Sequence, residues 1–168
     1  FISPKLPDER PETIIPGSIS DLPAMEISQI NSSLQRILIV EDNDDLRNYL
    51  VDMLKTSYNI QACPNGKDAL IIIREFNPDF VISDIMMPEM SGDELCSAIK
   101  GDLEMSHIPV LLLTALGDEK NMLEGLKTGA DAYIIKPFSV GILKATVKNI
   151  LANRALLRLV YNSIEDKE

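Results

Sequence analysis

Polar or charged side chains follow directly after four apolar segments of this chain. They are Glu41, Asp42, Asp84, Thr114 and Lys136. Each has an ordinary explanation when taken alone, because acids cap helices, threonine favours strands and lysine extends to solvent. Their joint occurrence after four apolar segments instead suggests one shared site.

These residue types together favour chemistry on a phosphoryl group. Crowded carboxylates repel one another unless a cation joins them, and oxygen-only ligands favour Mg²⁺. The Asp84 carboxylate is then a candidate nucleophile toward phosphorus, as in enzymes that form aspartyl phosphates. Lys136 and Thr114 would hold phosphoryl oxygens, while the small Ala115 leaves the path of attack open.

The apolar segments that carry these residues are typical of buried strands. Continuous apolar runs are expected where a strand is covered on both faces. The predicted strands are 37–40, 58–63, 80–83, 109–113 and 132–135.

Segments with helical spacing alternate with the predicted strands. Leu46, Leu50 and Leu54 recur on one helix face, and Ser91 to Glu94 form a capping box that opens another helix. Further helices are expected after Gly66, around Met122 to Leu126 and from Ser139. This alternation predicts an α/β fold with a doubly wound, five-stranded parallel sheet and helices on both faces. Side chains at the carboxyl ends of its strands then converge.

Composition excludes several functions. The formal net charge of −10 disfavours direct binding to nucleic acid or to an anionic membrane. Cys63, Cys96 and His107 have no metal-site spacing, and a reduced, cytoplasmic location fits best. The sequence contains no apolar run of transmembrane length and no signal peptide.

Three regions are expected along the chain. Residues 1–34 hold half of the ten prolines and predict an extended linker, while residues 35–153 form the domain. Residues 154–168 continue the last helix with an apolar stripe. This extension either packs on its own domain or forms a linker or partner-binding helix. The chain begins with Phe1, so we expect it to be a segment of a longer protein or a processed form.

The segment from Arg36 to Ala152 resembles the receiver domains of two-component signalling, the response-regulator family. The matching motifs are "ILIVEDND", "PDFVISDIMMPEMSG", "VLLLTAL" and "GADAYIIKPF". The resemblance implies a flavodoxin-like fold with strand order 2-1-3-4-5.

The resemblance also implies roles for single residues. Asp84 would be the phosphoacceptor. Asp42 and Asp84 would bind Mg²⁺ directly with the backbone carbonyl of Met86, and Glu41 would act through water. Glu41 stands where many members have Asp, which lengthens that arm by one methylene.

A second set of residues would transmit the signal. Thr114 would be the switch hydroxyl, Lys136 the phosphate-binding lysine, and Tyr133 the aromatic that turns inward on activation. The family implies a cis peptide between Lys136 and Pro137. Ser91 departs from the Asp that often precedes the loop glycine.

The partner implied is a histidine kinase domain carrying phosphohistidine, on the same or another chain. His107, the single histidine, is expected to lie in a loop. The flanks favour a bacterial hybrid histidine kinase that regulates transcription, with a receiver of an ordinary response regulator as the alternative. In this family the fourth helix, the fifth strand and the fifth helix form one face, and dimerisation is expected through that face. Enzymatic activity would be limited to self-phosphorylation and self-dephosphorylation.

Other classes fit the residues less well. A haloacid-dehalogenase phosphohydrolase needs a second Asp where Met86 stands. A flavin-binding protein needs a Ser-, Thr- and Gly-rich loop after the first strand to hold phosphate, whereas the acidic segment 41–45 would repel that phosphate. A calcium loop from Asp42 fails because Arg47 and Met53 occupy its sixth and twelfth positions. A receiver-like interaction module that does not use phosphate is the remaining rival.

Overall fold

The computed structural model describes residues 34–115, 123 and 127–165. The linker predicted for residues 1–34 lies outside this part of the chain, except for Leu34. The helix predicted around Met122 to Leu126 also lies outside it, except for Leu123.

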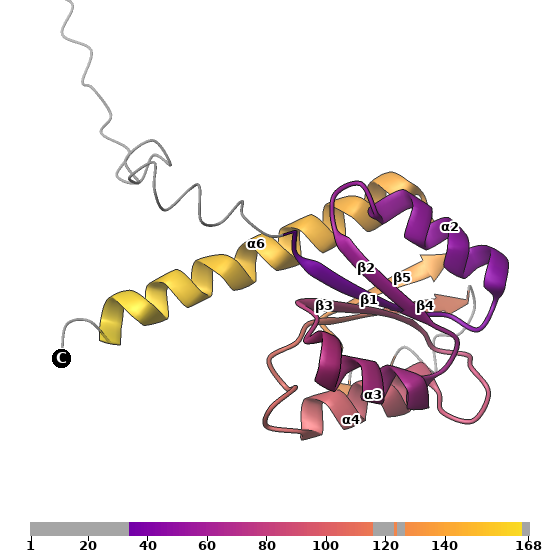
Figure 1. Ribbon diagram of the computed structural model, residues 1–168, viewed down its shortest axis with the longest axis horizontal. Helices are drawn as coiled ribbons and strands as arrows, with labels where there is room; N and C mark the ends of the chain where they lie inside the picture. Colours follow the sequence, from indigo (N-terminus) through magenta and orange to yellow (C-terminus); the bar gives the residue numbers. More distant parts are fainter. Residues whose placement is uncertain (1–33, 116–122, 124–126, 166–168) are drawn as a thin grey trace, which may run out of the picture. The chain divides into compact units, whose positions relative to one another are not determined.

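The strands form one parallel sheet in the order β2-β1-β3-β4-β5, as predicted (Figure 1). Their bounds are β1 Arg36–Val40, β2 Asn59–Cys63, β3 Phe80–Asp84, β4 Val110–Ala115 and β5 Ala132–Lys136. The central strands β1, β3 and β4 are buried almost throughout, in keeping with their unbroken apolar sequences. The edge strands β2 and β5 are less buried: each has a single buried residue, and its other positions are half-buried or exposed.

The register of the sheet brings the predicted site residues to one edge. Asp84, the last residue of β3, lies beside Leu113 of β4. The next residue of β4, Thr114, lies beside Ile135, and Lys136 follows at the end of β5. Because all strands run parallel, their carboxyl ends share this edge.

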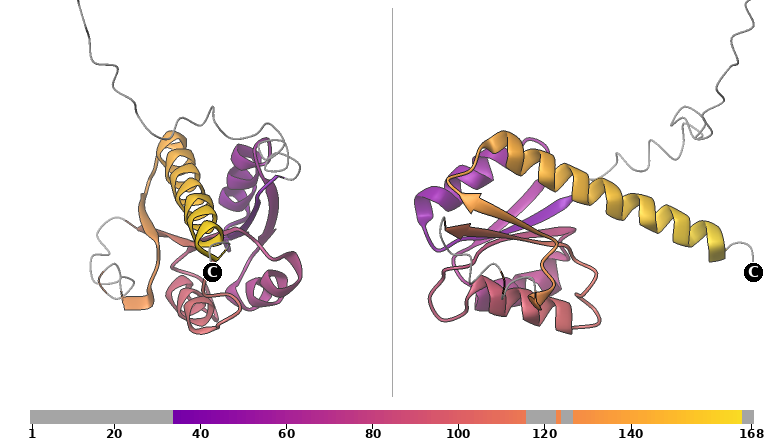
Figure 2. Two further views of the ribbon diagram at one scale, coloured as in Figure 1. Left: turned by 90° about the vertical axis from the view of Figure 1, so that its left-hand side faces the viewer. Right: turned by 180° about the vertical axis from the view of Figure 1, so that it is seen from behind.

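Helices cover both faces of the sheet. Figures 1 and 2 show α3 and α4 on one face and α2 and α6 on the other. Their bounds are α2 Asp44–Leu54, α3 Gly66–Phe76, α4 Gly92–Gly101 and α6 Val140–Glu165.

Each face has its own hydrophobic core. Ile73 of α3 and Ile99 of α4 pack against one face, while Leu50 of α2 and Val147 of α6 pack against the other. All four side chains are almost fully buried, and the apolar face predicted for the first helix, with Leu50 and Leu54, is confirmed.

Local sequence signals define the helix ends. The predicted capping box is present: Ser91 accepts a hydrogen bond from the Glu94 amide, and the Glu94 carboxylate accepts one from the Ser91 amide. Asn77 ends α3 in the left-handed region at φ 48°, directly before Pro78.

Helix α6 extends well past the sheet. Leu143, Val147 and Leu151 are its buried residues, and the helix then continues to Glu165 with exposed side chains. The helix is thus continuous beyond Leu151, and its apolar side chains from 156 to 164 are not buried against any described part of the domain. Within residues 34–115, 123 and 127–165, no helix is long and apolar enough to cross a membrane.

Candidate functional site

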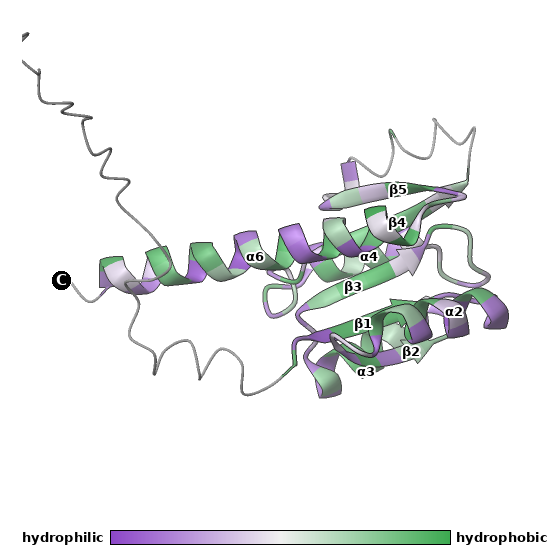
Figure 3. Ribbon diagram, turned by 90° about the horizontal axis from the view of Figure 1, so that it is seen from above, coloured by the Kyte–Doolittle hydropathy of each residue, from purple (hydrophilic) through white to green (hydrophobic). Residues whose placement is uncertain are grey.

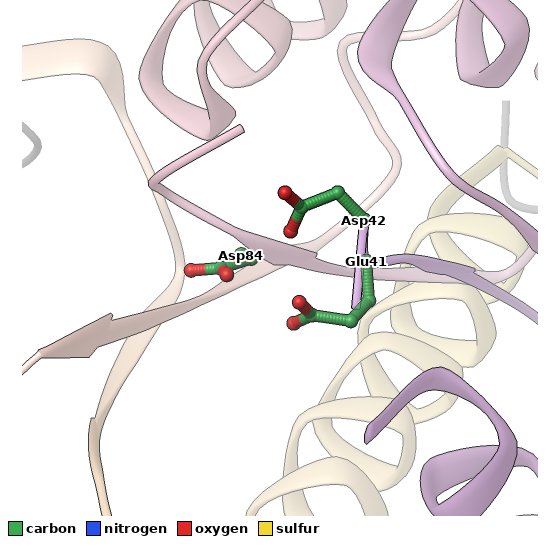
Figure 4. A group of neighbouring side chains, drawn as sticks. All are labelled: Glu41, Asp42 and Asp84. Carbon is green, nitrogen blue, oxygen red and sulfur yellow. The ribbon is translucent and has the colours of Figure 1, made fainter. Parts of the chain in front are cut away.

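The carboxylates of Glu41, Asp42 and Asp84 meet at the carboxyl edge of the sheet (Figure 4). Glu41 and Asp42 follow directly after β1, and Asp84 ends the neighbouring strand β3. One oxygen atom from each residue lies within 4.8 Å of the other two. The topology thus brings Asp84 to two acids that precede it by more than forty positions in the sequence.

The three acids differ in their access to water. Glu41 is 1% exposed and Asp84 is 7% exposed, whereas Asp42 is exposed. The cluster is therefore buried on one side and open to solvent on the side of Asp42. A small polar reactant can reach it without any change in the core.

Burial and charge repulsion hold a proton on Glu41 at unusually high pH. Burial of the side chain raises its pKa from 4.5 to about 7, and the neighbouring Asp84 adds to the increase. Lys136 and a hydrogen bond from the Asn43 amide act in the opposite direction but do not outweigh these effects. The site therefore disfavours its own full ionisation in the absence of a cation.

Lys136 supplies the positive charge that reaches the cluster. Its Nζ atom lies 2.9 Å from Asp84 Oδ2 and 3.4 Å from Glu41 Oε2. The side chain arrives from the end of β5 and is about a quarter exposed. The peptide bond from Lys136 to Pro137 is cis, as the family resemblance implied.

The side-chain hydroxyl of Thr114 forms no hydrogen bond with the described residues. The residue is 1% exposed, and its Oγ1 atom is buried without a hydrogen-bond partner among the described residues. Buried hydroxyls are normally paired, because desolvation without a partner is unfavourable. A buried hydroxyl at the carboxyl end of β4 without a partner among the described residues is a candidate donor for a group bound at this edge.

The remaining predicted residues lie around this cluster. Tyr133 packs against the core beneath α3 and α4, and burial raises the pKa of its phenol. The Met86 amide donates to Asp84 Oδ1 at 3.3 Å, while the Met86 side chain is mostly exposed. Met87 packs against the core.

Two residues that support the site were not predicted from the sequence. A Cβ atom on Gly92 would lie 2.1 Å from the Asp84 carbonyl oxygen, so only glycine allows the loop to close over Asp84. Arg47 donates to the Glu41 carbonyl oxygen at 2.9 Å and holds the turn that carries both Glu41 and Asp42. The glycine after the Ser91 cap was a visible signal, whereas nothing in the sequence near Arg47 indicated its contact.

A cavity of about 370 Å³ lies at the other end of the strands. It is lined by residues before β1, β3 and β4, such as Gln35 and Pro109, and by α6 residues from Leu151 to Asn162. Neither the acid cluster nor Lys136 contributes to it. This hollow therefore lies between α6 and the residues that precede the strands, and it is separate from the acidic site.

The chemistry of the donors limits what the cluster can bind. All three side chains offer carboxylate oxygens, and no cysteine or histidine joins them within the described part of the chain. Hard oxygen donors with an open side suit Mg²⁺, which retains part of its water shell. The raised pKa of Glu41 indicates the same need for a cation.

Comparisons with known proteins agree with this geometry. Residues 37–148 match the family described as the response regulator receiver domain. The chain is 48% identical over 127 residues to histidine kinase P4 of Formosa agariphila and 40% identical over 127 residues to the sensor histidine kinase TmoS of Ectopseudomonas mendocina. These alignments cover 76% of this chain but only 9% and 13% of the two kinases.

A solved structure shows the same fold. The receiver domain of a signal transduction histidine kinase from Syntrophus aciditrophicus superposes with a TM-score of 0.68 at 38% identity, covering 71% of this chain and 91% of that one. The architecture defines a flavodoxin-like α/β domain. The chain belongs to the response regulator receiver domain family, and it is therefore a receiver domain of two-component signalling.

Proposed function

We propose that this receiver accepts a phosphoryl group on the carboxylate of Asp84. The observation that carries the proposal is the position of Asp84, which lies between two further carboxylates and 2.9 Å from Lys136 Nζ. A nucleophile for phosphorus needs a cationic environment that offsets the charge of the incoming group. Lys136 provides one part of that environment.

The reaction would transfer the group from a phosphohistidine. An Asp84 oxygen attacks phosphorus, the bond from phosphorus to the donor imidazole nitrogen breaks, and its electron pair stays on that nitrogen. The product is an acyl phosphate on Asp84. The donor lies in a histidine kinase domain of the same or another chain, because His107 is the single histidine here and belongs to the loop before β4.

Glu41, Asp42 and Asp84, with the Met86 backbone carbonyl, are the residues that would hold Mg²⁺. When bound, the ion neutralises negative charge that builds up on the phosphoryl oxygens. Lys136 would bind one phosphoryl oxygen, and the hydroxyl of Thr114, which has no partner among the described residues, would donate to another.

The signal would leave the site through Thr114 and Tyr133. Bonding of the Thr114 hydroxyl to the phosphoryl group favours one of two domain conformations, and the inward position of Tyr133 favours the same one. Phosphorylation shifts the population only as far as it stabilises that conformation more than the other.

We place this receiver in a hybrid histidine kinase that regulates transcription. The support is its 48% and 40% identity to parts of two much longer histidine kinases. In this organisation residues 1–34 form a linker, 35–153 the receiver and 154–168 a helical extension. A receiver of an ordinary response regulator is the alternative.

The test is intact-mass spectrometry after incubation with acetyl phosphate and Mg²⁺. The parent protein is expected to gain the mass of one phosphoryl group, and a chelator is expected to prevent the gain. The Asp84→Asn variant preserves the size of the side chain but lacks the nucleophile, so it should gain nothing. An equal gain in that variant would show that the acceptor is another residue.

Beryllofluoride separates the two explanations of a negative result. If the parent gains no mass but its circular dichroism or thermal stability changes with beryllofluoride and Mg²⁺, the site works and requires its own kinase. If neither reagent has an effect, the domain is an interaction module that does not use phosphate.

A further inference from the structure

The last part of α6 separates from the domain at a defined point. Leu151 is the last buried residue of the helix, and Arg154 then forms an ion pair with Asp131 at 2.8 Å. Beyond Arg154 the helix runs on for a further three turns without a buried residue. Figures 1 and 3 show this extension projecting past the sheet.

Large apolar side chains lie together on this extension. They form a surface that we call the apolar arc: Leu156, Leu157, Val160, Tyr161 and Ile164. These side chains are between 49% and 69% exposed. At 3.6 residues per turn they span about 140° of the helix circumference, which is wide enough to form a packing face.

The apolar arc is not a continuation of the face that packs on the sheet. By helical position, its centre is turned by about 110° from the line of Leu143, Val147 and Leu151. The line of those core residues instead continues into Arg154 and Arg158. A straight helix therefore cannot bury both faces against its own domain.

An exposed helix of this kind gains little stability on its own. Short helices in water depend on packing of an apolar face. No residue from 155 to 165 is buried, and Leu157 and Tyr161 only line the hollow that the extension shares with residues before the strands, such as Pro109. Contiguous exposed apolar surface of this extent marks an interaction site. The apolar arc carries no charged side chain, so covering it buries no charge.

We propose that the apolar arc binds the same arc of a second copy of this chain. The spacing along the seam is that of a coiled coil: Leu157, Val160 and Ile164 are separated by three and four positions. Seven positions before Val160 stands the exposed Asn153, whereas Ile150, seven positions before Leu157, packs against the core of its own domain and marks where the seam begins. A single polar residue in such a seam, here Asn153, sets the register of pairing.

The available area is sufficient for a dimer. A half-exposed large side chain still exposes about 100 Å², given that an aromatic residue buries 150–250 Å² in full. Complete burial of five such side chains from each copy removes on the order of 1,000 Å² from water, which is the minimum for a specific interface and corresponds to a weak, concentration-dependent dimer. An apolar, uncharged arc is complementary to itself, as a twofold-symmetric contact requires.

Sedimentation equilibrium of the 168-residue chain tests this proposal. The mass is expected to rise with concentration from 18.6 kDa toward twice that value, with neither Mg²⁺ nor a phosphoryl donor present. Leu157→Glu combined with Val160→Glu should weaken dimerisation by more than about 100-fold, because pairing would bury unpaired carboxylates. The control is Asn162→Glu, which places the same charge on the far side of the helix and should leave the dimer intact.

Two outcomes would overturn the proposal. A chain that remains at 18.6 kDa at every concentration would show that a second copy does not cover the apolar arc. A dimer that persists in the double variant would show that another surface pairs. Circular dichroism of each variant checks that the domain is folded.

Oxidation of Val160→Cys provides a second measurement. It should give a disulfide-linked dimer, whereas Asn162→Cys should not. The native Cys63 and Cys96 are both buried, so they do not compete for this disulfide.

Discussion

Replacing Glu41 with glutamine should stabilise the metal-free protein at alkaline pH. The carboxylate is 1% exposed and lies beside Asp84, so its ionisation in the folded protein is unfavourable. Glutamine has nearly the same shape and keeps an oxygen for the hydrogen bond from the Asn43 amide. The substitution therefore removes the charge without removing the contact.

The magnitude follows from the pKa of Glu41. Burial, and then the charge of Asp84, raise it from 4.5 to about 7. The folded protein thus binds this proton more tightly than the unfolded chain does, so the free energy of unfolding falls as pH rises from 4.5 to 7. At about 1.4 kcal/mol per pH unit, the loss amounts to about 3 kcal/mol and is complete above pH 7.

Urea unfolding followed by circular dichroism measures this effect, since the chain has no tryptophan. In the presence of a chelator, Glu41→Gln should be more stable than the parent by up to about 3 kcal/mol at pH 8 and equally stable near pH 4.5. Mg²⁺ should stabilise the parent more than the variant. The control is Glu75→Gln, which changes an exposed acid far from the cluster.

Two results would refute the reasoning. If parent and Glu41→Gln show the same dependence of stability on pH, the charge of Glu41 is not opposed in the folded protein. If the variant is less stable than the parent at pH 8, Glu41 makes a net favourable interaction with Lys136 that outweighs burial and Asp84.

Two further substitutions test the close contact between Gly92 and the Asp84 backbone and the role of the Thr114 hydroxyl. Gly92→Ala places a Cβ atom 2.1 Å from the Asp84 carbonyl oxygen and should lower the free energy of unfolding by about 3 kcal/mol, whereas Gly101→Ala, with no atom within 4 Å, should be neutral or stabilising by up to about 1 kcal/mol. Equal urea midpoints for the two variants would contradict this contact. Thr114→Val removes a buried hydroxyl that has no partner among the described residues, so stability should change by less than about 1 kcal/mol. The rise in melting temperature with beryllofluoride and Mg²⁺ should nevertheless be smaller than in the parent, and an undiminished rise would exclude a role for Thr114 in binding the phosphoryl group.

Much of the fold could be predicted because buried positions are occupied by apolar residues, and this pattern is visible in the sequence. A strand covered on both faces has no position for a polar side chain, so β1, β3 and β4 read as unbroken apolar runs. Helix ends could be predicted equally well where a side chain caps the backbone, as at Ser91. Alternation of the two element types then favoured one parallel sheet.

The convergence of Asp84, Thr114 and Lys136 could also be predicted, because parallel strands place their carboxyl ends at one edge. The functions assigned to these residues stay predictions until phosphorylation is measured. Exact contacts were beyond the sequence: Lys136 reaches Glu41 across 95 positions, and such a pairing depends on strand order and register.

The sequence by itself therefore determined the elements, their order along the chain and the residue types available at the edge of the sheet, since these follow from local patterns of polarity. Tertiary structure alone decided which atoms approach one another. It raised the pKa of Glu41 by burying it beside Asp84, brought Gly92 against the Asp84 backbone, and left the apolar arc of α6 exposed. Each of these depends on how separate elements pack in space, and no local pattern encodes that packing.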